Sequence, residues 1–268
     1  TNHSIPIGYE AFRSLWNVAS RIIMLYPVAA NIKKYDAIIA VSRPAAEYIS
    51  LFYPKKIHIV PPPIDDEFFE ASASKEDIGF SEDDKIVLFV GRLDPKKGLE
   101  FALYAFRLVV MSEPRARLCI VGPGRAPYLW HLRKLVDAWG LEENVFFVGK
   151  IPRSLLVKYY AASDVFVFPS YGGESFGIVV LESMASGTPV VTTLGGALGS
   201  FISKYGLGLV TGFSTVRYAR AILTLLRSKE LRERMGRRAR RFARLFSWDR
   251  LFRRIEGIYR AVYRDREG

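Results

Sequence analysis

The sequence contains almost no cysteine. Its 268 residues include a single one, Cys119, which lies in the apolar run LCIVG. One thiol cannot form an intrachain disulfide, so we expect a fold that needs no oxidising compartment, with Cys119 as a buried structural residue.

Long apolar runs are missing as well. Residues 22–30 form the longest run near the start of the chain, and this run is broken by Pro27 and too short to span a bilayer. No signal peptide is visible, and we expect a cytoplasmic protein.

Motifs that would point to a metal or a dinucleotide are also missing. The chain has three histidines, and none lies near a group of Cys or Asp residues with the spacing of metal ligands. We expect His58, inside a strand, and His131, in a helical pattern, to be structural. The sequence contains no GxGxxG, no P-loop and no DxD-type motif, so a dinucleotide enzyme, an ATPase and a metal-dependent site all lack support.

Positive charge is in excess. The formal net charge is +12, which indicates an anionic partner or surface. Three interpretations remain open: a solvated helix face with Glu partners, a face for anionic lipid or polyphosphate, and a nucleic-acid surface, although no recognised nucleic-acid module accompanies the charge. Much of the excess lies on a helical pattern in the last part of the chain, on Arg232, Arg234, Arg237, Arg238, Arg240, Arg241, Arg244, Arg250, Arg253 and Arg254.

The first 63 residues read as part of a domain. Residues 1–6 read as a strand end or loop. Short apolar strands follow over residues 36–41 and 56–60, and they alternate with helical patterns over residues 9–34 and 43–52. This order indicates parallel strands joined by helical crossovers. A full doubly wound domain needs more strands, so we interpret residues 1–63 as a partial Rossmann-like domain.

A domain boundary follows these residues. The three prolines at positions 61–63 end the sheet and form a stiff connector. We expect a second Rossmann-like domain over residues 64–246. The remaining residues, 247–268, predict a C-terminal helix that packs back toward the first domain, with Ser247 as its N-cap.

The second domain has a regular alternation of strands and helices. Near-continuous Val, Ile and Phe strands, each followed by a helical pattern, predict an α/β fold with a parallel sheet buried on both faces. Ligands of such sheets bind at the carboxyl ends of the strands. The predicted strands cover residues 85–91, 116–122, 145–149, 165–169, 188–193 and 206–210.

One stretch of this domain carries two carboxylates. Residues 170–187 read SYGGESFGIVVLESMASG, a glycine turn followed by an apolar helical pattern that starts near Phe176 and ends at Gly187. If the chain between Glu174 and Glu182 is mostly helical, the two residues lie about 12 Å apart along the axis, whereas a glycosidase needs its carboxyl pair roughly 5 to 9.5 Å apart. The pair could hold the two ends of an elongated ligand such as a sugar nucleotide, with helix amides as an anion site. Alternatively, they are an acidic first turn and a solvent-facing Glu.

Three glycine turns follow predicted strands. GRLDPKKG holds Gly91, Arg92 and Lys97 ahead of a helix, and a guanidinium with an ammonium at a helix N-terminus suits a diphosphate. VGPG places Gly122 where a flat base could approach the backbone. VGKIP places the main chain of Lys150 and Ile151 where it could read a base edge. Taken alone, each turn is also compatible with an ordinary surface loop.

Together these motifs resemble one family. GRLDPKKG, VGPG, VFFVGKIP, SDVFVFPS and ESFGIVVLESMASGTPVV occur in the order and spacing of the family-4 retaining glycosyltransferases. The resemblance covers residues 36–259 and implies the GT-B fold of two facing Rossmann-like domains, here with the second domain complete and the first partial. It also implies metal-independent transfer, with a nucleotide-diphosphate sugar as donor substrate and no other cofactor.

The resemblance assigns roles to individual residues. Arg92 and Lys97 match the residues that bind the donor diphosphate. Glu174 matches the glutamate that contacts the donor sugar, and Glu182 the one that binds the ribose hydroxyls. His3 lies in a T-x-H stretch that resembles the family's sugar-contacting histidine. The segment whose amides lie near the sugar and phosphates corresponds to Phe176, Gly177, Ile178 and Val179.

We therefore expect a retaining hexosyltransferase that moves a hexose from a UDP-, GDP- or ADP-sugar to a hydroxyl of a sugar, lipid or other acceptor. Arg92 and Lys97 would stabilise the charge that grows on the departing diphosphate, and Glu174 would orient the sugar. A non-catalytic sugar-nucleotide-binding module, or a subunit that needs a partner, is the alternative; an epimerase or phosphorylase of similar fold also remains.

Two kinds of macromolecular contact are expected. The partial first domain would leave a sheet edge unpaired, which predicts self-association. The arginine-rich helices predict peripheral contact with the anionic inner face of a membrane. Nucleic acid is not an expected partner.

Overall fold

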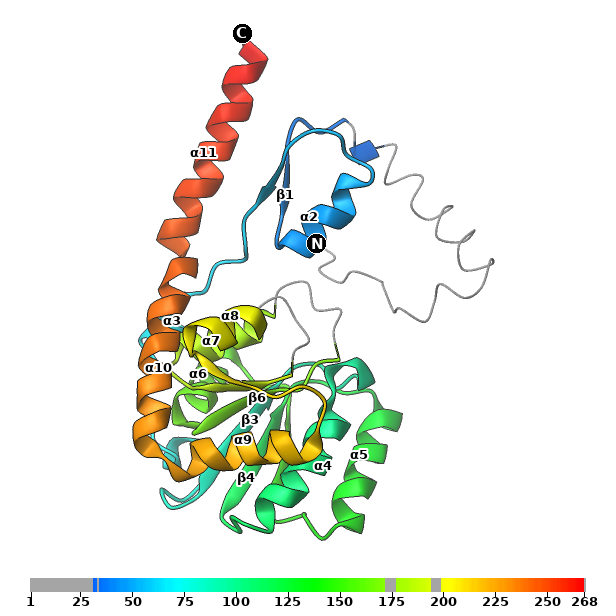
Figure 1. Cartoon of the computed structure of the whole chain (residues 1–268), viewed down its shortest axis with the longest axis vertical. Coiled ribbons are helices and arrows are strands. Elements are labelled where there is room, and N and C mark those ends of the chain that lie inside the picture. Colours follow the sequence, from blue (N-terminus) through cyan, green and yellow to red (C-terminus); the bar gives the residue numbers. More distant parts are fainter. Residues whose placement is uncertain (1–30, 33, 172–176, 194–198, 268) are drawn as a thin grey trace, which may run out of the picture. The chain divides into compact units, whose positions relative to one another are not determined.

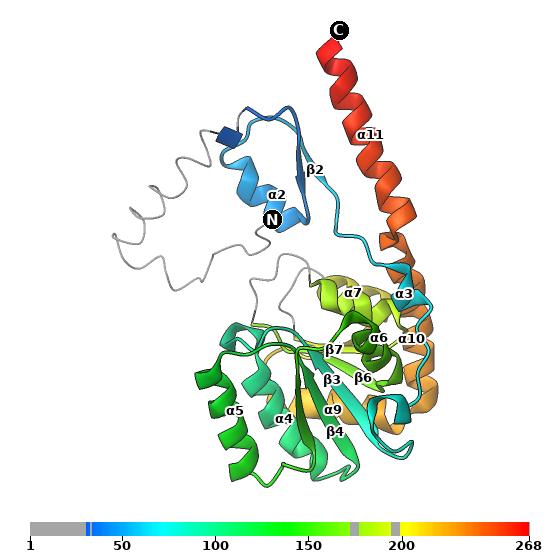
Figure 2. The same cartoon turned by 180° about the vertical axis from the view of Figure 1, so that it is seen from behind.

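The chain forms two compact units, and Figures 1 and 2 show it from opposite sides. The computed structural model describes residues 31–32, 34–171, 177–193 and 199–267. One unit comprises Thr1–Pro63, Gly173–Phe176 and Trp248–Gly268, and the other comprises Ile64–Gly172 and Gly177–Ser247.

The first unit contains a small parallel sheet. Strands β1 (Ile38–Ala40) and β2 (Ile57–Ile59) pair in parallel and are joined by helix α2 (Arg43–Ser50). The helix begins here because the Ser42 side chain accepts a hydrogen bond from the Ala45 amide, 3.3 Å away. The predicted parallel crossover is therefore confirmed. Most of the helix predicted over residues 9–34 lies outside the described residues.

The last helix of the chain also belongs to the first unit. Helix α11 (Trp248–Glu267) begins directly after Ser247. Arg250, Arg253, Arg254 and Arg264 on this helix are exposed. Arg260, also exposed, forms an ion pair with Glu256 one turn away, 2.7 Å between nitrogen and oxygen. No helix in the described part of the chain is long and apolar enough to cross a membrane.

The second unit is built on one sheet. Its six strands are all parallel and lie in the order β5-β4-β3-β6-β7-β8. The predicted α/β fold with a buried parallel sheet is thus confirmed. The strands are β3 (Lys85–Val90), β4 (Ala116–Val121), β5 (Val145–Gly149), β6 (Val165–Phe168), β7 (Val190–Thr192) and β8 (Gly208–Val210).

Helices cover both faces of this sheet, as Figures 1 and 2 show. Helices α4 (Leu99–Val110), α5 (Ala126–Ala138) and α9 (Thr215–Arg227) pack on one face. Helices α6 (Arg153–Ala162) and α7 (Ile178–Ala185) pack on the other. The remaining helical elements of the unit are α3 (Asp66–Phe69), η2 (Glu76–Ile78), η3 (Pro95–Lys97), α8 (Gly199–Tyr205), α10 (Lys229–Ala243) and η4 (Arg244–Phe246).

Strand residues alternate between the two faces, as the pleat requires. Val87 and Phe89 of β3 join the core under α4 and α9. Phe166 of β6 points to the other face, where its ring meets Tyr160 of α6. Both faces are apolar, which explains why the strands read as continuous hydrophobic runs. Cys119 of β4 is fully buried, as predicted, and burial raises the pKa of its thiol to about 12.

The chain reverses its direction across the sheet at β3. From β3 it proceeds outward through β4 to β5, and then returns to β6 on the other side of β3. The carboxyl ends of β3 and β6 therefore lie side by side at a topological switch point. In open α/β sheets, ligands bind in the crevice that opens at this place.

Candidate functional site

Two loops meet at the switch point. The first is GRLDPKKG after β3, and the second starts at Pro169 after β6. A Cβ added to Gly98 would lie only 2.0 Å from the Pro169 carbonyl oxygen, so the two backbones are in direct contact. The Tyr171 amide also donates a hydrogen bond to the Lys96 carbonyl, at 3.3 Å. The structure thus brings together the two segments in which the sequence analysis placed the diphosphate-binding residues and the carboxylates.

The loop after β3 has a defined shape. The Asp94 side chain caps the short helix η3 by accepting a hydrogen bond from the Lys96 amide, at 2.9 Å. Gly98 ends η3 in the left-handed conformation, with φ of 70°, and starts α4. Arg92 is exposed and Lys97 is half-buried on this loop. Both cations accordingly lie at the carboxyl edge of the sheet, close to the N-terminus of α4.

Gly98 combines a left-handed backbone with close contact to Pro169, and a comparison with another left-handed glycine separates the two effects. We expect Gly98→Ala to destabilise the fold by roughly 2–4 kcal/mol, from left-handed backbone strain and from overpacking against Pro169. Gly140 is the matched control, because its φ is also left-handed, at 63°, but nothing lies within 4 Å of an added Cβ. Gly140→Ala should cost only about 1–2 kcal/mol in urea unfolding. Equal costs for the two variants would show that the contact with Pro169 is unimportant.

The backbones of Gly91 and Gly122 lie in close contact. A Cβ added to Gly122 would lie 2.0 Å from the Gly91 carbonyl oxygen. The Gly122 amide donates to the Gly149 carbonyl at 2.8 Å, which extends the ladder between neighbouring strands. The close approach of two backbones requires glycine at position 122, and this reason is independent of any ligand. Lys150 and Ile151 follow β5, the outer neighbour of β4, and Lys150 is exposed.

The central helix begins later than predicted. Gly177 adopts the left-handed conformation, with φ of 77°, and α7 starts at Ile178 instead of near Phe176. Gly177 is not helical, so among the described residues the helical rise behind the 12 Å estimate applies from Ile178 to Glu182, and the part of the stretch before Gly177 lies outside the described residues. Ile178 and Val179 supply first-turn amides of α7. Glu174 and Phe176 lie outside the described residues, and so does His3.

Glu182 is the described carboxylate of this site. It lies half-buried on α7, and one of its oxygens, Oε2, accepts a hydrogen bond from the Tyr160 hydroxyl at 2.9 Å. Burial raises the pKa of Glu182, although the Tyr160 hydroxyl and the Arg153 guanidinium lower it and Glu67 adds a further small increase. A carboxylate whose pKa is raised by burial and shifted by specific neighbours is a candidate functional residue.

The raised pKa predicts a pH-dependent gain in stability when Glu182 is replaced. The folded protein binds this proton more tightly than the unfolded chain, whose Glu keeps the ordinary pKa of 4.5. Protonated Glu182 therefore contributes to the free energy of unfolding. This contribution is fully present below pH 4.5 and is lost as the pH rises through the raised pKa of the folded protein. Glu182→Gln, which cannot ionise, should therefore be more stable than the wild type at pH 7, and the difference should shrink toward pH 5. Urea unfolding at both values checks this, and an equal difference at both would contradict it.

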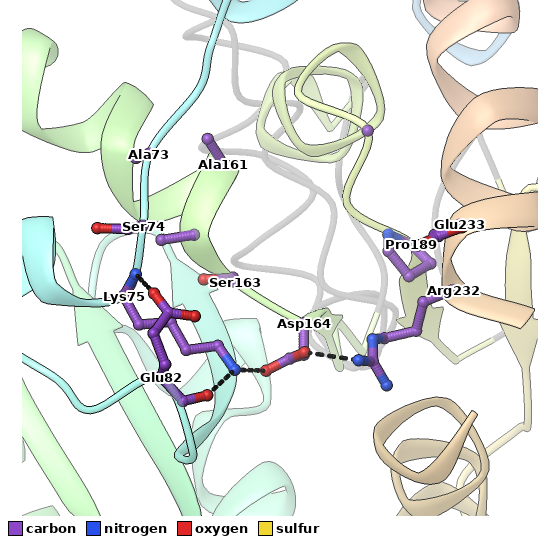
Figure 3. A pocket seen from close by; sticks show the side chains of 12 residues that line it. Ala73, Ser74, Lys75, Glu82, Ala161, Ser163, Asp164, Pro189, Arg232 and Glu233 are labelled. Atoms are coloured by element: carbon purple, nitrogen blue, oxygen red, sulfur yellow. Dashed lines mark hydrogen bonds and ion pairs between the residues drawn. The ribbon is translucent and has the colours of Figure 1, made fainter. Parts of the chain in front are cut away.

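A cluster of three charged side chains, which no sequence motif indicates, lies at the amino ends of the strands. Figure 3 shows Lys75 and Arg232 reaching Asp164 from two sides in a pocket of about 220 Å³. The Asp164 carboxylate lies 3.2 Å from Lys75 Nζ and 3.0 Å from an Arg232 guanidinium nitrogen, and it accepts the Ile86 amide at 2.9 Å. All three side chains are largely buried. Because Asp164 directly precedes β6, this group lies at the amino ends of the strands, away from the switch point.

This group corrects one interpretation of the C-terminal arginines. Arg232 does not lie on a solvated face, since it is one of the two cations on Asp164 and also donates to the Leu225 and Leu226 carbonyls. Arg234 and Arg237 instead form exposed ion pairs with glutamates one turn away on α10. The solvated-face interpretation therefore holds for these residues and fails for Arg232.

The described residues contain no cluster of metal-ligating side chains. Residues 31–32, 34–171, 177–193 and 199–267 contain no group of three or more His, Cys, Asp or Glu side chains that could hold a metal ion. His131 on α5 is exposed, and its Nε2 lies 3.5 Å from Glu100. His58 is half-buried in β2.

Residues 70–242 match the model of a protein family described as glycosyl transferases, group 1. A D-inositol 3-phosphate glycosyltransferase of Acidothermus cellulolyticus is 36% identical over 224 residues, which cover 80% of this chain and 50% of that protein. A protein of the same name from Corynebacterium glutamicum is 33% identical over 219 residues, covering 77% of this chain and 52% of that protein. The chain spans about half the length of the curated relatives it matches.

Solved structures match the fold. A sucrose-phosphate synthase of Thermosynechococcus elongatus is 26% identical, with a TM-score of 0.78, and the match covers 90% of this chain and 62% of that one. Anabaena HepE in complex with UDP is 20% identical, also with a TM-score of 0.78, and the match covers 97% of this chain and 71% of that one. The predicted fold class, α/β with parallel sheets of the GT-B type, is therefore confirmed.

Proposed function

Because the chain belongs to the group 1 glycosyl transferases, we propose that it moves a hexose from a nucleotide-diphosphate sugar to an acceptor hydroxyl with retention of anomeric configuration. The observation that carries this proposal is the contact between the loop after β3 and the loop after β6 at the switch point of the sheet. In this proposal, Arg92 and Lys97 on the loop after β3 lie beside the N-terminus of α7, the helix that follows the loop after β6. Such an arrangement suits a ligand that carries a diphosphate.

The chemistry follows from these groups. Cleavage of the bond between sugar and phosphate places growing negative charge on the departing diphosphate. Arg92 and Lys97, with the first amides of α4 and α7, stabilise that charge more in the transition state than in the ground state. The departing phosphate takes the proton of the acceptor hydroxyl, so no separate base is needed. In this proposal Glu174 and His3 contact the donor sugar.

The nucleoside end of the donor is assigned to the α7 side of the site. Glu182 accepts hydrogen bonds from the ribose hydroxyls, a role that suits a half-buried carboxylate held by a neighbouring hydroxyl. Gly91 and Gly122 let the donor approach the backbone, and the main chain at Lys150 and Ile151 reads the base. The amides of Gly177 and of the first two residues of α7, Ile178 and Val179, lie toward the phosphates and the sugar.

A turnover experiment tests the proposal. The chain is incubated with UDP-, GDP- and ADP-hexoses, with D-inositol 3-phosphate, which appears in the names of the curated relatives, and with simple sugars as acceptors. Release of nucleoside diphosphate measures turnover, and the coupling constant of the new anomeric proton in NMR spectra gives the configuration. We expect one class of donor to be consumed with retention. Binding without turnover would support the non-catalytic module instead, and an inverted product would contradict retention.

A further inference from the structure

Tyr160 is a buried polar side chain next to Glu182, and it is packed by aromatic rings. It lies on α6 and is 0% exposed. Its ring is packed from two sides, against Phe68 of α3 at 5.7 Å between centroids and against Phe166 of β6 at 5.6 Å. These two edge or tilted contacts fix the plane of the ring. The packed ring therefore fixes the position of the hydroxyl oxygen, which donates its proton in the direction of the acceptors within its reach.

That direction is toward α7. The Tyr160 hydroxyl lies 2.9 Å from Glu182 Oε2 and 3.3 Å from the Val179 carbonyl oxygen, one turn earlier on the same helix. The carbonyl of Val179 is already part of the helix, so Glu182 is the shorter and stronger acceptor. Among the described residues, none donates a hydrogen bond to the other oxygen of Glu182, Oε1. One oxygen is thus tied to the protein, and the other is available to a ligand.

The charged neighbours cannot replace this hydrogen bond. Among the described residues, Arg153, at the start of α6, and Glu67, on α3, are the charged groups that shift the pKa of Glu182. Arg153 is already engaged, because its guanidinium forms ion pairs with Asp65 and Glu67 and lies over the Phe68 ring. The Tyr160 hydroxyl is consequently the one described group that sets the direction of the Glu182 carboxylate by a direct hydrogen bond.

We propose that Tyr160 is a positioning residue, whose hydroxyl holds the Glu182 carboxylate in the orientation in which Oε1 receives the ribose hydroxyls of the donor. The inference rests on the proposed function, since it needs Glu182 to bind ribose. It adds a residue that never touches the ligand and acts through the carboxylate. A side chain with this role should affect the recognition of ribose and leave the binding of base and phosphates unchanged.

The test compares two ligands in each variant. Calorimetry measures the affinity for the nucleoside diphosphate that binds best and for its 2′,3′-dideoxy analogue, and the ratio of the two affinities reports ribose recognition. We expect Tyr160→Phe to lower this ratio by about tenfold, the size of one hydrogen bond to a charged group. Tyr159→Phe is the matched control, because Tyr159 is the preceding residue on α6 and is also buried, and its ratio should equal that of the wild type.

A double-mutant cycle shows whether Tyr160 acts through Glu182. Glu182→Gln should lower the ratio by itself, and Tyr160→Phe should then have little further effect. Additive effects, or an equal loss of affinity for both ligands in Tyr160→Phe, would overturn the inference and indicate a purely structural tyrosine. A ratio of one in the wild type, unchanged by Glu182→Gln, would instead overturn the proposed role of Glu182.

Two further measurements test the role of Tyr160, one through the pH dependence of ribose recognition and one through a variant that keeps the hydroxyl. Without the hydroxyl, the pKa of Glu182 rises further, so ribose recognition in Tyr160→Phe should be lost at a higher pH than in the wild type, while Arg153 and Glu67 stay unchanged. If Tyr160→Phe does not fold, Phe68→Leu loosens one side of the ring and keeps the hydroxyl. It should lower the ratio by less than tenfold, and an unchanged ratio would count against the inference.

Discussion

Replacing Lys97 with alanine is expected to abolish glycosyl transfer, with a loss of at least about 100-fold, while the fold remains intact. Lys97 is half-buried on the loop after β3, outside the apolar core, so its removal leaves the packing of the sheet unchanged. In the proposed mechanism it stabilises the charge on the departing diphosphate. Affinity for the nucleoside diphosphate should fall about tenfold or more, whereas affinity for the nucleoside, which has no phosphate, should not change.

The chain offers a matched control for this variant. Lys96 is the neighbouring residue of η3, carries the same charge and is exposed. Lys96→Ala removes one positive charge from the same loop and should leave both affinities within about twofold of the wild type. Circular dichroism confirms the fold of both variants. Folded and fully active Lys97→Ala protein would rule out the assignment, and equal losses in the two variants would indicate a general effect of charge.

The largest expected loss of stability lies at the other edge of the sheet. Asp164→Ala should destabilise the second unit by about 3–5 kcal/mol, because it leaves Lys75 and Arg232 largely buried without their shared carboxylate. It also removes the acceptor of the Ile86 amide. Each surviving cation keeps carbonyl partners, Lys75 on Asp84 and Arg232 on Leu225, but loses its ion pair. Urea unfolding measures the loss.

An exposed ion pair provides the comparison. Asp83 lies 2.9 Å from Arg115, but both side chains are mostly exposed, so solvent screens their attraction. Asp83→Ala should cost less than about 1 kcal/mol. A small loss in Asp164→Ala, similar to that in Asp83→Ala, would mean that the buried group contributes little and that water replaces the carboxylate in the pocket. The difference between the two variants in the free energy of unfolding therefore tests whether burial makes the Asp164 ion pairs important for stability.

The second unit could be predicted well from the sequence because its strands are unambiguous. Runs such as KIVLFV and VFVF are apolar on both faces of the sheet, so their pattern alone indicates buried parallel strands. Each predicted strand is present in the structure to within a few residues. The two loops of the site follow β3 and β6 directly, so knowledge of the strands also placed Arg92, Lys97 and Glu182 at one edge.

Other features could not be predicted, for identifiable reasons. The start of α7 depends on the left-handed backbone of Gly177, and an apolar pattern does not report a single φ. Tyr160 lies in a helix with two adjacent tyrosines, and the sequence does not say which ring faces α7. Asp164 looks like an ordinary residue ahead of a strand, because its partners Lys75 and Arg232 are far away along the chain.

A crystal structure of the chain soaked with the best-binding nucleoside diphosphate tests the central claim most directly. We predict the ligand at the carboxyl ends of β3 and β6, with its diphosphate within hydrogen-bonding distance of Arg92 and Lys97 and its ribose hydroxyls on Glu182. The pocket beside Lys75 and Arg232, at the amino ends of the strands, is another place where two cations meet. A diphosphate bound there, with the switch point unoccupied, would contradict the account.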